Sequence, residues 1–80
     1  MYNLYILKCA DKTFYTGIAK NLGKRVGEHN AGNRGAKYTR SRRPARLVYK
    51  RAFRNRSNAQ KAEHKIKALS RIDKMGLIRE

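Results

Sequence analysis

Cysteine is almost absent from this sequence. Cys9 is the only one in 80 residues, so the chain can form no intrachain disulfide and has no cluster of thiolates for zinc. We interpret Cys9 as a small apolar residue, half-buried at the end of a strand. A reducing, cytoplasmic location is therefore expected.

Long apolar segments are missing as well. Charged residues interrupt every stretch before it reaches the ~18 residues that a membrane-spanning helix needs. Residues 1–8 have neither a basic leader nor a small-residue cleavage site, so we predict a strand there rather than a signal peptide. The sequence shows no internal repeat, low-complexity tract or linker, and we expect one domain over residues 1–80.

Acidic residues are scarce. Five Asp and Glu stand against 21 Lys and Arg, which gives a formal net charge of +16. Such a charge destabilises the fold by self-repulsion unless a polyanion or salt neutralises it, and phosphate backbones bind to it by releasing counterions. A basic helix lying on an acidic membrane is the alternative. We disfavour it because the basic residues are spread along the chain, and we predict a nucleic acid partner and no membrane.

The first part of the chain predicts a β-hairpin. Residues 2–9 carry apolar groups on both faces, as a central strand does, and residues 13–18 are β-branched and aromatic. The short link between them requires an antiparallel pair. With the turn centred near residue 10, we expect Tyr5 and Tyr15 to lie opposite each other on one face.

The next predicted elements are a helix and a strand. Asn21 is a suitable N-cap for a helix over residues 22–31, with Leu22 and Val26 on its buried side. A loop through 31–35 ends this helix and leads into an irregular basic segment. Residues 46–50 then read as a third strand.

Two further helices follow. Ser57 and Gln60 form a capping box, which predicts a helix from there to about Leu69. Its apolar stripe consists of Ala59, Ala62, Ile66 and Leu69. A last helix over 71–77 is expected to dock through Ile72, Met75 and Leu77. The order β-β-α-β-α-α predicts an α/β (α+β) fold, a small three-stranded antiparallel sheet flanked by helices.

Two tyrosine triplets stand out against this layout. Asn3-Leu4-Tyr5 and Tyr15-Thr16-Gly17 lie about ten residues apart, and Arg25, His29 and Glu63 follow in that order. Together they resemble the GIY-YIG nuclease superfamily. The first triplet stands where that family has Gly-Ile-Tyr and the second where it has Tyr-Ile-Gly.

The resemblance covers nearly the whole chain, from Asn3 to at least Ile66. Asn3 replaces the glycine of the first motif, and Thr16 replaces the isoleucine of the second. The segment Ala36-Lys37-Tyr38-Thr39 is similar to one found in small stand-alone bacterial members of the family. The resemblance implies the same small α/β layout.

Glu63 is the acid whose position most needs an explanation. It lies at the edge of the predicted core-facing stripe, where an unpaired carboxylate is costly. A salt bridge to a nearby cation and a bound metal both explain it equally well. The resemblance implies the family's metal-binding glutamate, with Mg²⁺ as cofactor and Mn²⁺ as a substitute, since Mg²⁺ suits one carboxylate plus waters and substrate oxygens.

Arg25 and His29 project together from the first helix at i and i+4. From composition alone, Arg25 reads as one solvated cation among many. The resemblance implies that Arg25 is the catalytic arginine, which holds the scissile phosphate, and that His29 accepts a proton or orients its neighbours. We expect Glu28 to face away from Arg25 and leave it out of the site.

Tyr5 and Tyr15 have an ordinary interpretation too, as core tyrosines with a solvated hydroxyl. The resemblance implies that both hydroxyls belong to the active site. We favour Tyr5 as general base and Tyr15 as the group that positions water or phosphate, although the roles can be exchanged. A phenol has a pKa near 10, so this role requires positive charge nearby, which Arg25 supplies.

The densest basic stretch is interleaved with an aromatic residue. It predicts contacts with phosphates and stacking on a base, although a solvated charge run is the simpler alternative. The candidate nucleic-acid-binding residues are Lys37, Tyr38, Arg40, Arg42 and Arg43.

The resemblance implies a metal-dependent endonuclease that hydrolyses DNA phosphodiesters. DNA is preferred to RNA on that ground only. The sequence has no appended DNA-recognition module, so cleavage is expected to be structure-selective or non-specific, or to depend on a protein partner for target choice. The alternative is a basic DNA- or RNA-binding protein that does not cut.

Overall fold

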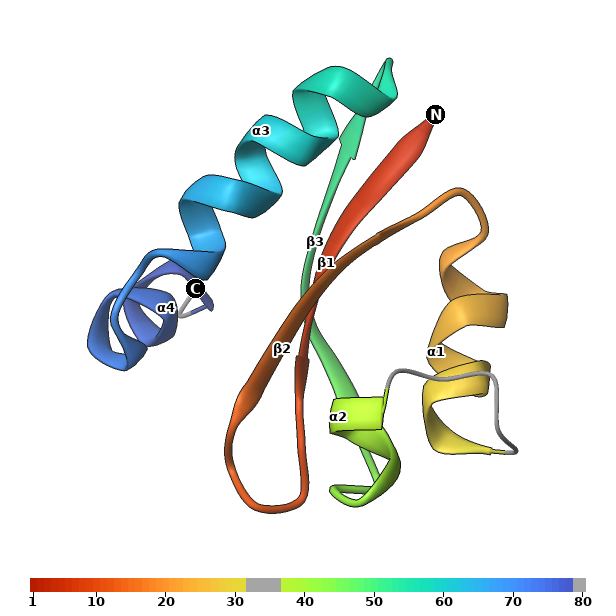
Figure 1. Cartoon of the computed structure of the whole chain (residues 1–80), viewed down its shortest axis with the longest axis vertical. Coiled ribbons are helices and arrows are strands. Elements are labelled where there is room, and N and C mark those ends of the chain that lie inside the picture. Colours follow the sequence, from red (N-terminus) through yellow and green to blue (C-terminus); the bar gives the residue numbers. More distant parts are fainter. Residues whose placement is uncertain (32–36, 79–80) are drawn as a thin grey trace.

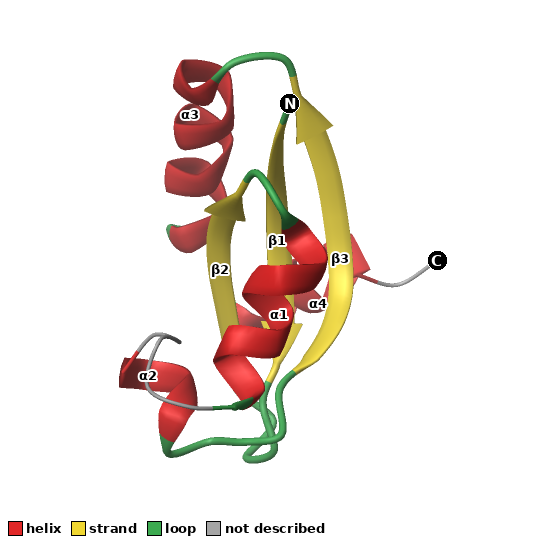
Figure 2. Ribbon diagram, turned by 90° about the vertical axis from the view of Figure 1, so that its right-hand side faces the viewer, coloured by secondary structure: helices red, strands yellow, loops and turns green. Residues whose placement is uncertain are grey.

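A three-stranded antiparallel sheet carries helices on both of its faces (Figures 1 and 2). The computed structural model describes residues 1–31 and 37–78. The elements are β1 (Tyr2–Lys8), β2 (Phe14–Ala19), α1 (Leu22–Asn30), α2 (Lys37–Arg40), β3 (Arg46–Phe53), α3 (Arg56–Lys67) and α4 (Arg71–Ile78). The predicted fold class and order are confirmed. The short helix α2 is an addition, because we expected irregular structure there.

Strand β1 lies at the centre of the sheet, in the order β2-β1-β3. Its side chains alternate between the faces, and both sets are buried. Leu4 and Ile6 pack with Ile66 of α3 on one side, whereas Tyr5 and Leu7 form a second cluster on the side of α1. Two apolar faces are what a central strand between two helix layers requires. Cys9 packs in the second cluster as a small apolar residue, and it is buried there rather than half-buried as predicted.

The register of the hairpin differs from our expectation. Tyr5 pairs with Gly17 and Tyr15 with Leu7, so the two tyrosines are diagonal neighbours rather than opposite each other. The turn is centred one residue later than expected, because Lys12 takes a left-handed conformation (φ 68°) and Asp11 accepts hydrogen bonds from Thr13. An even spacing still places both tyrosines on one face, and their ring centroids are 6.4 Å apart.

Helix α1 begins as predicted. The Asn21 side chain accepts a hydrogen bond from the Lys24 amide, and Leu22 and Val26 pack on the second cluster. At the other end of α1, the Asn30 side chain bonds both the amide and the carbonyl of Ala45. This pair of bonds fixes α1 to the segment that leads into β3. Most of the predicted loop, 32–35, lies outside the described residues.

The predicted capping box at Ser57 and Gln60 is wrong. Helix α3 begins two residues earlier, where the Asn55 side chain accepts a hydrogen bond from the Asn58 amide. Asparagine is at least as good an N-cap as serine, and Asn55 comes directly after the turn that ends β3. The earlier start adds Arg56 to the first turn of α3.

Of the three docking residues predicted for the last helix, Leu77 is confirmed, and Ile72 and Met75 are wrong. Ile72 and Met75 are exposed, whereas Leu77 and Ile78 pack on the cluster around Leu4. The inward face of α4 therefore follows an i, i+4 pattern that starts at Lys74 rather than at Ile72. Leu69 is exposed too, because α3 already ends at Lys67. Within the described residues, no helix has the length and apolar character that a membrane span requires.

Candidate active site

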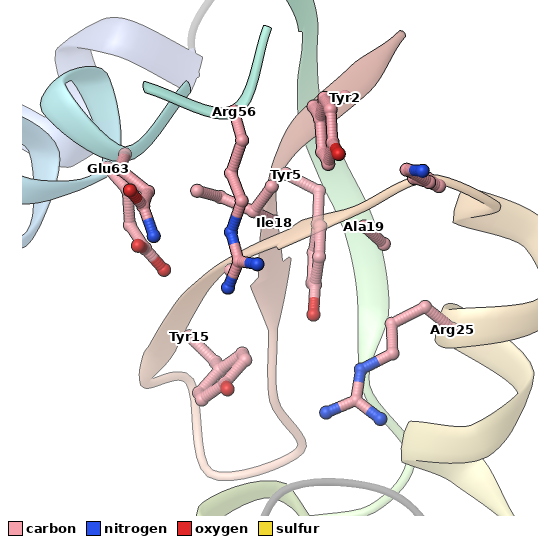
Figure 3. A pocket seen from close by; sticks show the side chains of 11 residues that line it. Tyr2, Tyr5, Tyr15, Ile18, Ala19, Arg25, Arg56 and Glu63 are labelled. Carbon is pink, nitrogen blue, oxygen red and sulfur yellow. The ribbon is translucent and has the colours of Figure 1, made fainter. Parts of the chain in front are cut away.

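A cavity of about 290 Å³ opens at the edge strand β2 (Figure 3). Its floor comes from β1 and β2, and its walls come from α1 on one side and α3 on the other. Four of the predicted site residues line it: Tyr5, Tyr15, Arg25 and Glu63. They come from four different elements, so the fold is what brings them together.

Tyr5 lies deepest in this group. Its side chain is buried, and its hydroxyl lies 2.8 Å from Nε2 of His29. Gly17, opposite it on β2, makes room for the ring. A Cβ at position 17 would lie 2.5 Å from the Tyr5 hydroxyl oxygen and 2.6 Å from Cζ. The glycine of the second motif is therefore needed for close approach.

His29 lies behind Tyr5 and does not line the cavity. It is fully buried, and its Nδ1 lies 2.7 Å from Oγ1 of Thr39 on α2. The tautomer with the proton on Nδ1 donates to Thr39 and leaves Nε2 to accept from the Tyr5 hydroxyl. Burial means that His29 reaches a substrate through Tyr5 rather than by direct contact.

Burial keeps both partners of this hydrogen bond neutral. Desolvation raises the pKa of Tyr5 to about 12, and interaction with Arg25 lowers it by less. Our expectation that Arg25 favours the phenolate is thus outweighed by burial. Burial also lowers the pKa of His29, and the positive charge of Arg25 lowers it further. At neutral pH the pair is a phenol and an uncharged imidazole.

Arg25 points toward the cavity from α1 (Figure 3). Its Nη1 lies 3.1 Å from Oε1 of Glu28, and both side chains are partly buried. Our expectation that Glu28 faces away was wrong, because residues at i and i+3 share a side of a helix. Glu28 therefore fixes one edge of the guanidinium.

Glu63 lies where its carboxylate faces both the cavity and a neighbouring cation. It lines the cavity, and its Oε2 lies 3.3 Å from Nζ of Lys67 one turn along α3. The Lys67 side chain is 55% exposed, against 23% for Glu63. A pair with one solvent-exposed partner contributes little to stability, so a cation of higher charge can displace the ammonium.

Among the described residues that line the cavity, Glu63 is the one carboxylate. No group of three His, Cys, Asp or Glu side chains lies together within 1–31 and 37–78. Mg²⁺ commonly takes one or two carboxylates and completes its shell with waters and substrate oxygens. Glu63, facing a cavity wide enough for both, fits that pattern.

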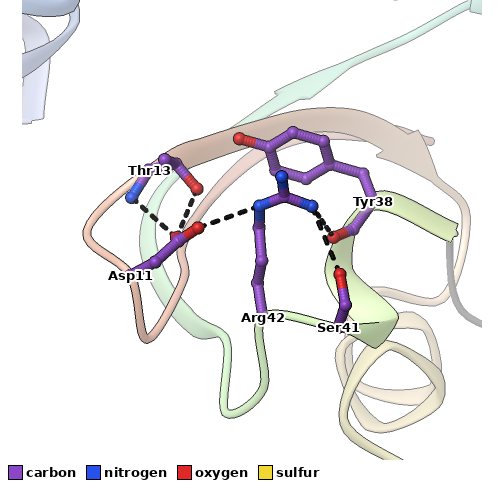
Figure 4. Close-up of polar contacts among 5 residues, drawn as sticks. All are labelled: Asp11, Thr13, Tyr38, Ser41 and Arg42. Atoms are coloured by element: carbon purple, nitrogen blue, oxygen red, sulfur yellow. Dashed lines mark hydrogen bonds and ion pairs between the residues drawn. The ribbon is translucent and has the colours of Figure 1, made fainter.

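The predicted nucleic-acid-binding residues surround α2, and some already have partners within the protein. The Arg42 guanidinium lies 4.1 Å from the Tyr38 ring centroid and bonds Asp11 through Nε (Figure 4). Tyr38 also stacks on Tyr15. Arg43 donates to the His29 carbonyl. The remaining two, Lys37 and Arg40, are exposed.

Comparison with known proteins identifies the family of this chain. A family model described as the GIY-YIG catalytic domain matches residues 1–75. The chain belongs to the GIY-YIG family. This confirms the resemblance inferred from the two tyrosine triplets, and it places the domain among nucleases that act on nucleic acids and are generally metal-dependent.

Relatives of this GIY-YIG domain carry the name UPF0213. The UPF0213 protein DP2720 of Desulfotalea psychrophila is 51% identical over 76 residues, covering 95% of this chain and 69% of the relative. The UPF0213 protein NP_0776A of Natronomonas pharaonis is 51% identical over 75 residues, covering 94% of this chain and 87% of that relative. The solution NMR structure of the UPF0213 protein BH0048 from Bacillus halodurans matches with a TM-score of 0.62 and 42% identity, covering 98% of this chain and 83% of that one.

Three residues in or behind the cavity were not singled out as site residues from the sequence. Arg56 and Gln60 line the cavity beside Glu63, and their spacing of seven and three residues before it places them on one side of α3. That spacing was a usable signal. Thr39 had none, because its contact with His29 exists only after α1 and α2 pack together.

Proposed function

We propose that this GIY-YIG domain is a metal-dependent endonuclease that hydrolyses phosphodiester bonds in DNA. The observation that carries the proposal is the convergence of Tyr5, Tyr15, Arg25 and Glu63 on one cavity, with Tyr5 bonded to His29. A structural role for a tyrosine, an arginine or an acid is common when each stands alone. Their convergence in a basic cavity is what a phosphoryl-transfer site needs.

Tyr5 takes the proton from the attacking water. Because its pKa is about 12, a free phenolate is rare at neutral pH, and the proton moves in two linked steps. The water gives its proton to the Tyr5 oxygen while the Tyr5 hydroxyl gives its own to Nε2 of His29. Because burial lowers the pKa of His29, the imidazole is uncharged at neutral pH and Nε2 is in the protonation state that accepts a proton.

Arg25 and Tyr15 hold the phosphate. The guanidinium is a planar cation that suits phosphate oxygens and offsets the charge developing on them. The Tyr15 hydroxyl orients the water or a phosphate oxygen. Glu63, with Lys67 displaced, would hold the divalent metal, which supplies charge stabilisation at the leaving oxygen when bound.

The basic surface around α2 extends the binding of the backbone. Lys37 and Arg40 are exposed, so we expect them to contact phosphates directly. Tyr38 and Arg42, stacked on each other, present a cationic aromatic surface beside Tyr15. Arg43 adds charge near His29. Contacts to phosphates and stacking on bases carry little sequence information, so we expect structure-selective or non-specific cleavage of DNA.

Replacing Glu63 tests the proposal. Glu63→Ala should reduce Mg²⁺-dependent cleavage by about 1000-fold, since the metal is worth several kcal/mol in the transition state, while DNA binding is nearly retained. The purified protein is incubated with branched, flap and linear DNA, and in parallel with RNA. Each substrate is tested with Mg²⁺ or Mn²⁺ and with EDTA. Asp73→Ala, which removes an exposed acid on α4, is the matched control.

Each outcome of this assay has a clear meaning. Full activity in Glu63→Ala contradicts the assigned metal role. A wild-type protein that binds every substrate and cuts none supports the alternative, a non-catalytic binding protein. Affinity alone does not separate the two, because both lose binding as salt increases.

A further inference from the structure

A second guanidinium enters the cavity opposite Arg25. Arg56 is the first residue of α3, and its side chain extends from that helix into the cavity, while Arg25 approaches from α1 (Figure 3). The hydrolytic scheme above gives Arg56 no role. Its position therefore needs a separate explanation.

Stability does not explain it. The amino end of a helix carries a partial positive charge, so a cation there is unfavourable, and the first turn of α3 has no acidic residue to compensate. Arg56 makes no ion pair with any residue in 1–31 or 37–78. It also shares a cavity with the cation Arg25, in a chain of net charge +16. An anionic ligand between the two removes these costs.

The cavity is too large for a single phosphate group. At about 290 Å³, it has the volume of about ten water molecules of the liquid. Arg56, Gln60 and Glu63 line it from one side of α3 at i, i+4 and i+7. The rise of the helix separates the ends of this row by about 10 Å. A phosphate held between Glu63 and Arg25 therefore leaves room for another at the amino end of α3.

We propose that Arg56 binds the substrate phosphate adjacent to the scissile one. The inference rests on the proposed function for the identity of the scissile position. The guanidinium donates hydrogen bonds to two oxygens of that phosphate. The cavity then accommodates two consecutive phosphates of the backbone rather than one isolated phosphodiester. Arg56 then acts in binding, equally in the ground state and the transition state.

Binding without cleavage gives the first test. The affinity for a single-stranded oligonucleotide is measured in EDTA by fluorescence anisotropy, between about 50 and 200 mM salt. Arg56→Ala should weaken binding and reduce the slope of log K against log salt by about 0.7, the loss of one phosphate contact. Arg54→Ala removes the same charge from an exposed neighbour outside the cavity. It should change the slope by much less.

Cleavage kinetics give the second test. Arg56→Ala should raise KM by about tenfold and leave kcat nearly unchanged, the signature of uniform binding. Arg56→Lys keeps the positive charge but loses the two-pronged guanidinium, so its KM should lie between those of the wild type and Arg56→Ala. Equal affinities and slopes for the alanine variants at 54 and 56 overturn the proposal, as does a loss confined to kcat. If the wild type cleaves no substrate but Arg56→Ala still reduces the slope of log K against log salt, the phosphate site is supported and the nuclease function is contradicted.

Discussion

The chemistry of the cavity depends on a hydrogen bond between two neutral groups, the Tyr5 hydroxyl and the His29 imidazole. The same burial raises one pKa and lowers the other, so neither group needs to be charged before a proton moves. Thr39 completes the arrangement through Nδ1 of His29. Its role is to position the imidazole, since it does not line the cavity.

Thr39→Val tests this positioning. Valine has nearly the shape of threonine but no hydroxyl, so the imidazole loses the partner that favours a proton on Nδ1. We expect kcat to fall by about tenfold, which corresponds to one lost buried hydrogen bond. Thr16→Val is the control, because it removes a buried hydroxyl that has no hydrogen-bond partner among the described residues and does not line the cavity. Unchanged kinetics in Thr39→Val would show that the bond is only structural.

The pH profile reports on the same pair. The pKa of His29 is lowered by burial, so the imidazole stays neutral to a lower pH than an exposed histidine, whose pKa is about 6.5. In the wild type, kcat/KM should therefore stay level as pH falls to about 6.5 and decline only below it. An acid limb above pH 7 would contradict a neutral buried acceptor.

At the scale of elements, strand β2 packs closely against β1 at the site, where Gly17 contacts the Tyr5 ring. Gly17 lies under the Tyr5 ring, one strand over, and the next residue toward the turn, Thr16, is buried on the opposite face. Among the described residues, the Thr16 hydroxyl has no hydrogen-bond partner. An apolar residue is the usual occupant of such a position, and the isoleucine of the family motif would meet that need.

Gly17→Ala should separate Tyr5 from His29. The new methyl would lie 2.5 Å from the Tyr5 hydroxyl oxygen, so the ring must move, at a cost of about 1–3 kcal/mol in the free energy of unfolding. Cleavage should fall with it. Gly27→Ala on α1 is the control, because a Cβ there meets nothing within 4 Å and should stabilise the helix by about 1 kcal/mol. Urea unfolding and cleavage assays compare the two, and equal stabilities would refute the steric argument.

For the whole molecule, the dominant feature is unbalanced charge. A net charge of +16 lies within a body whose principal extents are 29, 27 and 21 Å. The Debye length is about 30 Å at 0.01 M salt and about 10 Å at 0.1 M, so charges repel across the whole protein at low salt. Three ion pairs among the described residues do little to offset this.

We therefore expect Tm to rise with NaCl from about 0.01 to 0.1 M, the range over which screening becomes local. A non-cleavable oligonucleotide should raise it further by mass action. Lys61→Glu, on the exposed side of α3, lowers the net charge by two and should flatten the dependence of Tm on salt. A Tm that does not respond to salt would mean that self-repulsion is unimportant for this fold.

Local patterns were sufficient for much of this structure. The apolar faces of residues 2–9 predicted a central strand, Asn21 predicted the start of α1, and the two tyrosine triplets predicted the family. These features depend on alternation, capping and short spacing, which neighbouring residues encode. The errors came where two nearby signals competed, as between Asn55 and Ser57 at the start of α3.

Other features exist only once the chain has folded. The hairpin register depends on one residue of turn geometry, and it places Gly17 rather than Tyr15 opposite Tyr5. The pKa values of Tyr5 and His29 follow from burial between β1, α1 and α2. Thr39 contacts His29 from a separate helix, 10 residues later in the chain. Desolvation and contacts between distant segments are properties of packing, and no local pattern carries them.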